Sequence, residues 1–117
     1  MTNEEMLNKR RFAVVGDTIN SEKYAYRIKN ALLENGYDVA SVGKELKSID
    51  DIEGEIDVLD LCINPIKGLS LLKETKKEIP FVLIQPGAGS EDIERYLTEK
   101  GIPFRNGCVL KALEERR

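Results

Sequence analysis

Five short apolar runs alternate along the chain with segments whose apolar residues recur at helical spacing. A strand that is covered on both faces of a parallel sheet is apolar at nearly every position, so the runs predict strands. The expected strands, numbered one to five along the chain, cover residues 11–15, 37–42, 56–63, 81–84 and 102–105. Helices are expected near residues 21–35, 65–78, 90–100 and 109–117, with a short helix or frayed lead-in over residues 1–10.

Small polar residues and glycines mark the ends of the expected helices. Ser21 or Asn20 is expected to cap the first long helix, and Gly36 is expected to end it. Its apolar stripe is expected to comprise Tyr24, Ile28, Ala31 and Leu32. Asn64, with Pro65 in the first helical position, and Ser90 are expected to cap the next two helices. Ser48 is expected to cap a single helical turn in the irregular stretch between the second and third strands.

Alternation of strands and helices at short spacing predicts an α/β fold with a doubly wound, Rossmann-like, five-stranded parallel sheet and helices on both faces. Crossovers between parallel strands are right-handed, which leaves few strand orders, and we expect 3-2-1-4-5. The whole chain, residues 1–117, is expected to form one domain.

The expected strand order places the exits of strands one and four side by side, where the winding of the sheet reverses. Two glycine-containing loops follow these strands, at residues 16–21 and 85–90. Each loop leads into a helix N-terminus, which favours anions through free amide groups and the helix dipole. We therefore expect the two loops to bind an anionic, nucleotide-like ligand.

The composition of the chain argues against several classes of partner and site. The chain carries a net charge of −3 and has no histidine, which argues against nucleic acid and excludes Ser-His-Asp, Cys-His and histidine-based zinc sites. No apolar run is long enough for a membrane span, and the N-terminus does not resemble a signal peptide, so a cytoplasmic protein is expected. Two cysteines far apart, Cys62 and Cys108, do not make a disulfide framework.

Common nucleotide-binding signatures are missing from the first loop. Only Gly16 of a G-x-G-x-x-G fingerprint is present, and no Gly-Lys-Ser/Thr of a Walker loop follows. A flavodoxin-type loop would be richer in serine and threonine, and a receiver domain would pair a second acid with Asp17. The loop therefore belongs to none of these classes.

The motifs, taken in order, are those of another family. Val14-Val15-Gly16 is followed by Thr18, by Asn20 with Lys23, and by Tyr26-Arg27. Later motifs are Gly36-Tyr37-Asp38-Val39, Ser48-Ile49-Asp50-Asp51-Ile52, Gln85-Pro86-Gly87 and the late Cys108. From about Arg11 to Leu113 the chain resembles the CoA-binding domain family, small stand-alone proteins similar to the Rossmann-like N-terminal domain of the succinyl-CoA synthetase α subunit.

The resemblance implies a non-catalytic module that binds CoA or an acyl-CoA, with the diphosphate between the two loops. Lys44, which follows strand two, is a candidate for the 3′-phosphate of the ligand. Asn64 and Pro65 either cap a helix or lie against the adenine, as that loop does in the family. The candidate binding residues are Gly16, Thr18, Asn20, Lys23, Lys44, Asn64, Pro65, Gln85, Pro86 and Gly87.

Two departures from the family pattern keep an alternative open. The chain has Val42-Gly43-Lys44 where the family usually has Val-Asn-Pro, and Cys62-Ile63 where Phe-Arg is frequent. The alternative is a scaffold or regulatory interaction protein with weakened or lost CoA binding, with a protein partner or a homodimer left open. A third hypothesis is thiol redox exchange through Cys108. No other catalytic group and no metal site is expected.

Overall fold

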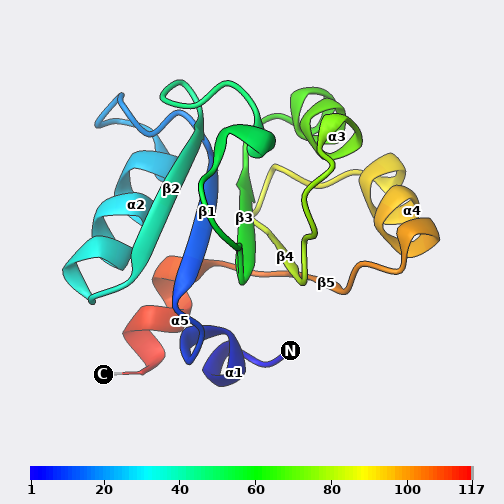
Figure 1. The fold of residues 1–117 in the computed structure, drawn as a ribbon. Helices are drawn as coiled ribbons and strands as arrows, with labels where there is room; N and C mark the ends of the chain where they lie inside the picture. The colour runs from blue at the N-terminus through cyan, green and yellow to red at the C-terminus, as the bar shows by residue number, and fades with distance from the viewer. Residues whose placement is uncertain (117) are drawn as a thin grey trace.

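A computed structural model describes residues 1–116. The strands are β1 (Arg11–Gly16), β2 (Asp38–Gly43), β3 (Val58–Cys62), β4 (Val82–Ile84) and β5 (Phe104–Asn106), as labelled in Figure 1. The helices are α1 (Asn3–Leu7), α2 (Tyr24–Glu34), α3 (Pro65–Glu74), α4 (Glu91–Lys100) and α5 (Val109–Glu115), with a single 3₁₀ turn η1 (Ile49–Asp51). Over residues 1–116, no helix has both the length and the apolar character needed to cross a membrane.

All five strands pair in parallel, which confirms the predicted α/β, Rossmann-like class. Their order is β2-β1-β3-β4-β5, so the predicted order 3-2-1-4-5 is wrong. The error concerns β3, which pairs with β1 instead of lying outside β2. Four of its five residues are buried, which suits the centre of a sheet, whereas β2 is partly exposed and forms an edge.

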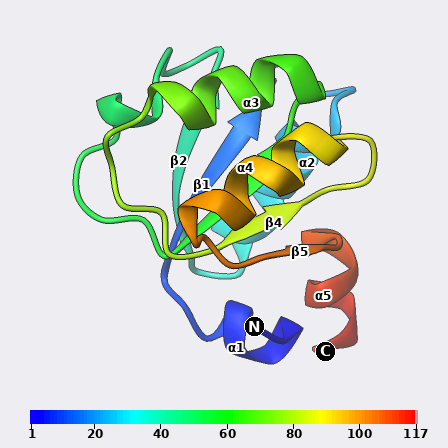
Figure 2. The ribbon, with the colours of Figure 1, turned by 90° about the vertical axis from the view of Figure 1, so that its right-hand side faces the viewer.

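Side chains of the central strands alternate between two separate apolar clusters, one on each face of the sheet. In β1, Ala13 and Val15 join the cluster under α3 and α4, while Phe12 and Val14 join the cluster under α1, α2 and α5. Figure 2 shows α3 and α4 together on the first face. This two-sided burial explains why the strands are apolar at consecutive positions.

The polar caps predicted for α3, α4 and η1 are present. The side chain of Asn64 accepts a hydrogen bond from the Lys67 amide, and that of Ser90 from the Ile93 amide. The cap predicted for α2 is wrong, because this helix begins only after Lys23, which provides no side-chain cap. The Asn20 side chain instead accepts a hydrogen bond from the Glu22 amide within the preceding turn.

Candidate functional site

The winding of the sheet reverses between β1 and β3. The chain leaves β1 through α2 to reach β2 on one side, and the strand on the other side, β3, is followed by α3 on the opposite face. Ligands of open α/β sheets bind outside the carboxyl ends of the strands at such a point. The observed order therefore moves the expected crevice from the exits of β1 and β4 to the exits of β1 and β3, with the β4 exit next in line.

A groove lies at this position and has two arms. The first, which we call the cationic arm, has a volume of about 460 Å³ and is lined by lysines from three segments. The second, the apolar arm, has a volume of about 420 Å³ and reaches from the start of α2 to the loop after β4. Residues that line both arms are Asp17, Lys23, Ile63 and Asn64. The two arms therefore form one continuous groove along the carboxyl edge.

The floor of the groove is backbone, because the strands approach closely at Gly16. A Cβ atom on this residue would lie 2.2 Å from the Cys62 carbonyl oxygen and 2.8 Å from the Ala25 Cβ. No side chain fits there, so packing between β1, β3 and α2 alone requires the glycine. The predicted role of Gly16 in ligand binding stays a prediction, although the residue does line the cationic arm.

Asp17 organises the first loop. Its Oδ1 accepts hydrogen bonds from the amides of Ile19, at 3.1 Å, and Asn20, at 3.0 Å. These bonds lower the pKa of the Asp17 carboxyl, and the positive charges of Lys44 and Lys23 lower it further. An acid beside an expected anion site is thus explained by the turn that it builds.

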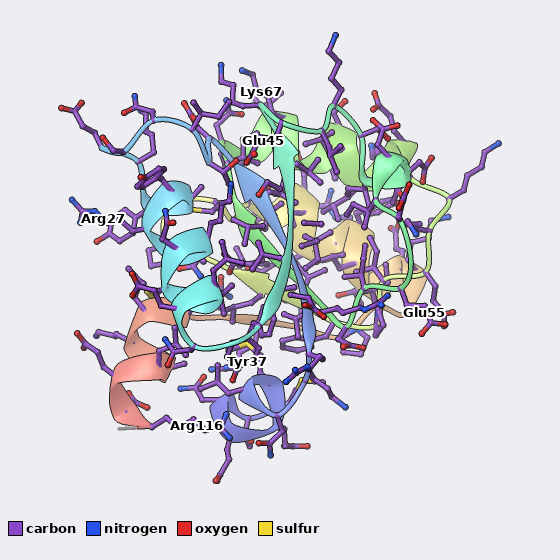
Figure 3. All side chains as sticks on the ribbon, turned by 60° about the vertical axis from the view of Figure 1, so that its left-hand side comes forward. Arg27, Tyr37, Glu45, Glu55, Lys67 and Arg116 are labelled. Carbon is purple, nitrogen blue, oxygen red and sulfur yellow. The ribbon has the colours of Figure 1, made fainter. Side chains whose placement is uncertain are left out.

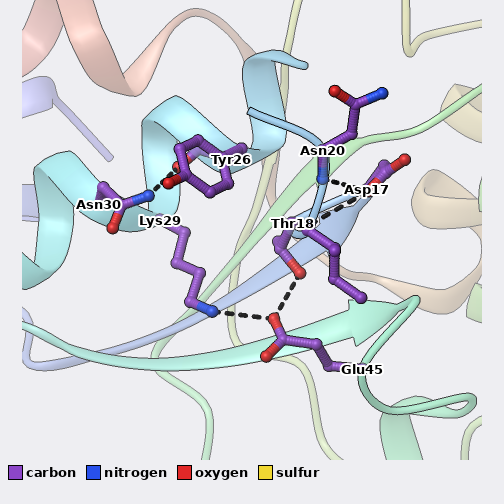
Figure 4. Close-up of polar contacts among 8 residues, drawn as sticks. Asp17, Thr18, Asn20, Tyr26, Lys29, Asn30 and Glu45 are labelled. Atoms are coloured by element: carbon purple, nitrogen blue, oxygen red, sulfur yellow. Dashed lines mark hydrogen bonds and ion pairs between the residues drawn. The ribbon is translucent and has the colours of Figure 1, made fainter. Parts of the chain in front are cut away.

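Two predicted binding residues of the first loop do not line the groove. Thr18 is buried, and its hydroxyl donates a hydrogen bond to Glu45 Oε2 at 2.6 Å (Figure 4). Asn20 is exposed and belongs to the turn before α2. Lys23, a further predicted binding residue that follows this loop, lines both arms.

Among residues 1–116, four lysines and two acids line the cationic arm. Lys23 and Lys44 were expected from the sequence, whereas Lys47 and Lys67 were missed. Lys67 was accessible to sequence reasoning, because it lies in the first turn of α3, three residues after the cap Asn64. Figure 3 shows Lys67 and Glu45 at one end of the molecule, opposite Tyr37 and Arg116. The acids are Asp17 and Glu74, so the arm is net positive in a chain of net charge −3.

The first turns of α2 and α3 differ in whether a side chain already accepts a hydrogen bond from their backbone amides. In α3, Asn64 accepts from the Lys67 amide at 3.0 Å and Pro65 has no amide hydrogen to offer. Asn64 lines both arms, but Pro65 lines neither. In α2 no side chain caps the first turn, and Tyr24 and Ala25 of that turn line the apolar arm. The α2 start is therefore the helix end that can offer amides to an anion in the groove.

The second wall of the groove is the loop after β4, in which some residues line the groove and the side chain of Gln85 is buried beneath it. Pro86 and Gly87 line the apolar arm, and their role in ligand binding stays a prediction. Gln85 is buried and lines neither arm, since its side-chain amide donates to Asp60 Oδ1 at 2.5 Å. Burial raises the pKa of the fully buried Asp60 to about 7, although the bond from Gln85 opposes this shift. Gln85 therefore supports the wall from below.

Cys62 is half-buried and lines the apolar arm. Burial, together with the nearby Asp60 and Cys108, raises the pKa of the Cys62 thiol to about 12. A thiol with this pKa is protonated at neutral pH and is a weak nucleophile. Cys108 precedes α5 without capping it, and it lines neither arm.

Comparison with protein families gives one match. The sequence model described as "CoA binding domain" matches residues 10–114, which is nearly the whole chain. Among proteins with curated descriptions, none matches the sequence.

Solved structures share the fold. A conserved hypothetical protein from Pyrococcus furiosus is 29% identical, with a TM-score of 0.80 over 91% of this chain and 99% of its own. Prb, a protein redesigned for binding, is 25% identical, with a TM-score of 0.83 over 98% of this chain and 92% of its own. A hypothetical protein from Pyrococcus horikoshii OT3 is 24% identical with a TM-score of 0.86 over the same shares of the two chains, a likeness of fold alone.

Proposed function

This chain belongs to the CoA binding domain family, and from that premise we propose that its carboxyl-edge groove binds CoA or an acyl-CoA. The observation that carries the proposal is the junction of two unlike arms at Asp17, Lys23, Ile63 and Asn64. CoA is itself built of two unlike parts, a triply phosphorylated adenosine end and a much less polar pantetheine chain. The cationic arm matches the first part and the apolar arm matches the second.

Phosphate groups are the natural occupants of the cationic arm. Lys44, Lys47 and Lys67 come from the β2 exit and the first turn of α3, so they surround the arm from two sides. Lys23 and the uncapped start of α2 stand at the junction, where a diphosphate would connect the two ends of the ligand. By contrast, the hollow at the opposite edge of the sheet is lined by Arg11 with three acids, Asp38, Glu53 and Glu55, and does not suit an anion.

The pantetheine chain would lie in the apolar arm, between the start of α2 and the loop after β4. Its lining includes Tyr24 at the start of α2, Cys62 at the end of β3, and Pro86 and Ala88 in the loop after β4. Binding without catalysis is part of the proposal, because the one thiol in this arm has a strongly raised pKa and the chain has no histidine to act as its base.

A second candidate function, a regulatory interaction module, is favoured by apolar side chains at the same edge. Ile19, Tyr24 and Ile66 are 61%, 60% and 84% exposed, and all three lie at the carboxyl ends of β1 and β3. Exposed apolar residues beside a groove suit a protein partner. This candidate requires no ligand, so a chain that binds neither CoA nor an acyl-CoA would favour it over the first.

Thermal unfolding of the full chain with CoA, acetyl-CoA, NAD, FMN and ATP, each at the same concentration, tests the proposal. A ligand at about 100 times its Kd adds roughly 2.7 kcal/mol to the free energy of unfolding. For a chain of this size the midpoint should rise on the order of 10 °C. We expect this rise with CoA or acetyl-CoA and a smaller one with the others. Equal shifts for all five compounds, or none, would overturn the proposal.

A further inference from the structure

Glu45 connects two segments of the groove without facing the groove itself. It lies in the loop after β2, between Lys44 and Lys47, but does not line either arm. Its Oε2 accepts a hydrogen bond from the Thr18 hydroxyl at 2.6 Å and from Lys29 Nζ at 2.9 Å (Figure 4). Both donors belong to the segment that follows β1, so a single carboxylate oxygen joins the β2 exit to the β1 exit.

Besides this connection, the β2-exit loop is held by a short backbone turn and by Leu46, which packs against the apolar cluster under α3 and α4. The Gly43 amide donates to the Leu46 carbonyl at 2.6 Å, and the Leu46 amide donates to the Ser41 carbonyl at 3.0 Å. These bonds shape the turn but do not attach it to the first loop. Lys44 and Glu45 are neighbours at its tip, with Lys44 lining the cationic arm and Glu45 directed towards Thr18 and Lys29.

The Glu45 contacts are suited to holding a position. Hydrogen bonds from Thr18 and then from Lys29 lower the pKa of the Glu45 carboxyl, which keeps it ionised at neutral pH. Thr18 is 2% exposed, so its hydroxyl has an anchored place in the fold. A charged acceptor with a buried hydroxyl donor forms a short and strong hydrogen bond.

We propose that Glu45 is a positioning residue that holds the Lys44 turn against the first loop and thereby sets the preference of the groove for a 3′-phosphorylated ligand. The proposal rests on the proposed function, because it assumes that the cationic arm receives the phosphates of CoA. Lys44 supplies the positive charge that attracts the phosphate, and Glu45 holds Lys44 in the position where it can do so. The 3′-phosphate is the group concerned, since Lys44 follows the strand whose exit receives the ribose end of a nucleotide in related folds.

Whether removal of the Glu45 carboxylate weakens or strengthens CoA binding distinguishes a positioning role from a simple effect of charge. A carboxylate near the arm repels phosphate, so its removal should strengthen binding if charge is all that matters. Removal should weaken binding if the carboxylate positions Lys44. Glu74 provides the matched control, because it is an exposed acid that lines the same arm with no hydrogen bond from any other residue in 1–116.

The experiment measures the Kd of CoA and of 3′-dephospho-CoA by titration calorimetry for the full-length wild type, Glu45→Ala, Thr18→Val and Glu74→Ala. We expect Glu45→Ala and Thr18→Val to weaken CoA binding about tenfold, the scale of one charge-assisted contact, and to change dephospho-CoA binding by less than about twofold. Glu74→Ala should strengthen CoA binding slightly, because it removes a negative charge from the lining of the arm. Hydrogen exchange of the Leu46 amide without ligand should accelerate in Glu45→Ala but not in Glu74→Ala.

Three results would overturn the proposal. Stronger CoA binding by Glu45→Ala would show that Glu45 acts on the ligand only through its negative charge and does not position Lys44. Equal losses for both ligands would make it, or Thr18, a general support of the groove. Unchanged exchange at Leu46 would show that the turn does not depend on Glu45. In these cases the wild type still binds CoA, whereas a wild type that binds neither ligand overturns the proposed function and, with it, the specificity assigned to Glu45.

Discussion

The side-chain amide of Gln85 donates to Asp60 Oδ1 at 2.5 Å, and both side chains are buried beneath the groove. No group within residues 1–116 donates to the second oxygen of Asp60. The Gln85 carbonyl accepts from the Ala88 amide and so begins the turn that forms the second wall. A buried acid with one neutral partner thus supports the loop against which we expect the pantetheine chain to lie.

Stability should fall with rising pH because of Asp60. Burial raises its pKa in the folded chain to about 7 from 3.8, so the folded state holds a proton that the unfolded state has already released. The stabilisation is complete below pH 3.8 and is lost as pH rises towards 7. The loss amounts to roughly 4 kcal/mol of the free energy of unfolding.

Asp60→Asn should remove this pH dependence, because the amide is neutral at every pH and its oxygen still accepts from Gln85. Urea unfolding of both proteins between pH 4 and pH 8 measures the effect. The variant should match the wild type near pH 4 and become increasingly more stable up to about pH 7. A constant difference across the range would contradict the prediction, since carboxyls elsewhere titrate equally in both proteins.

Gly16→Ala should destabilise the fold through a steric clash. Its new Cβ would meet the Cys62 carbonyl oxygen and the Ala25 Cβ, so β1, β3 and α2 must separate. We expect a loss of about 3 kcal/mol in the free energy of unfolding. Gly36→Ala is the matched control, with a φ of +84° and no atom within 4 Å of the new Cβ, and should cost only about 1 kcal/mol. Similar losses in the two variants would show that close strand approach is not the reason for Gly16.

Lys67→Ala should weaken CoA binding about fivefold at low salt, because the lysine lines the cationic arm, and the effect should shrink as salt rises. Lys73→Ala is the control on the same helix, since its ammonium lies over the Tyr96 ring and not at the groove. Calorimetric titration at two salt concentrations measures both. Equal effects of Lys67→Ala and Lys73→Ala would show that Lys67 does not contact the ligand.

Cys62 should react slowly with iodoacetamide in the folded chain. Its raised pKa of about 12 leaves very little thiolate at pH 8, whereas an unfolded cysteine has a pKa of about 8.5. Peptide mass spectrometry after timed labelling, with and without urea, measures the difference. CoA should slow the reaction further because Cys62 lines the apolar arm. Labelling at the unfolded rate would mean that the thiol is neither buried nor near a negative charge.

Helix caps are predictable from sequence because they are made between close neighbours. Asn64 contacts the amide three residues later, and so does Ser90, which leaves tertiary structure little to decide. Where a helix starts is less local. The turn from Asn20 to Lys23 delays α2, so Ala25, Ile28 and Leu32 are buried, whereas Tyr24, which was expected in the apolar stripe, is exposed.

The predicted binding residues lie on the loops that follow the strands, but sequence position does not give side-chain direction. Lys23, Lys44, Asn64, Pro86 and Gly87 line the groove. Thr18 and Gln85 lie on the same loops but point into the fold, where Glu45 and Asp60 accept their hydrogen bonds. Lys47 was missed because an exposed lysine has no distinguishing signal until the segments around it are placed, whereas Lys67 had such a signal in its position three residues after the cap Asn64.

By itself, the sequence determined the five strands, the alternation with helices and the family, because periodicity, caps and ordered motifs are properties of neighbouring residues. Only the tertiary structure decided that β3 pairs with β1, which sets the neighbours at the carboxyl edge. The physical reason is that right-handed crossovers permit more than one strand order, and burial of the apolar β3 on both sides selects among them. Asn64 and Lys67 reach the groove beside the first loop because of that choice, whereas the Glu45 contact lies between β1 and β2, which are neighbours in both orders.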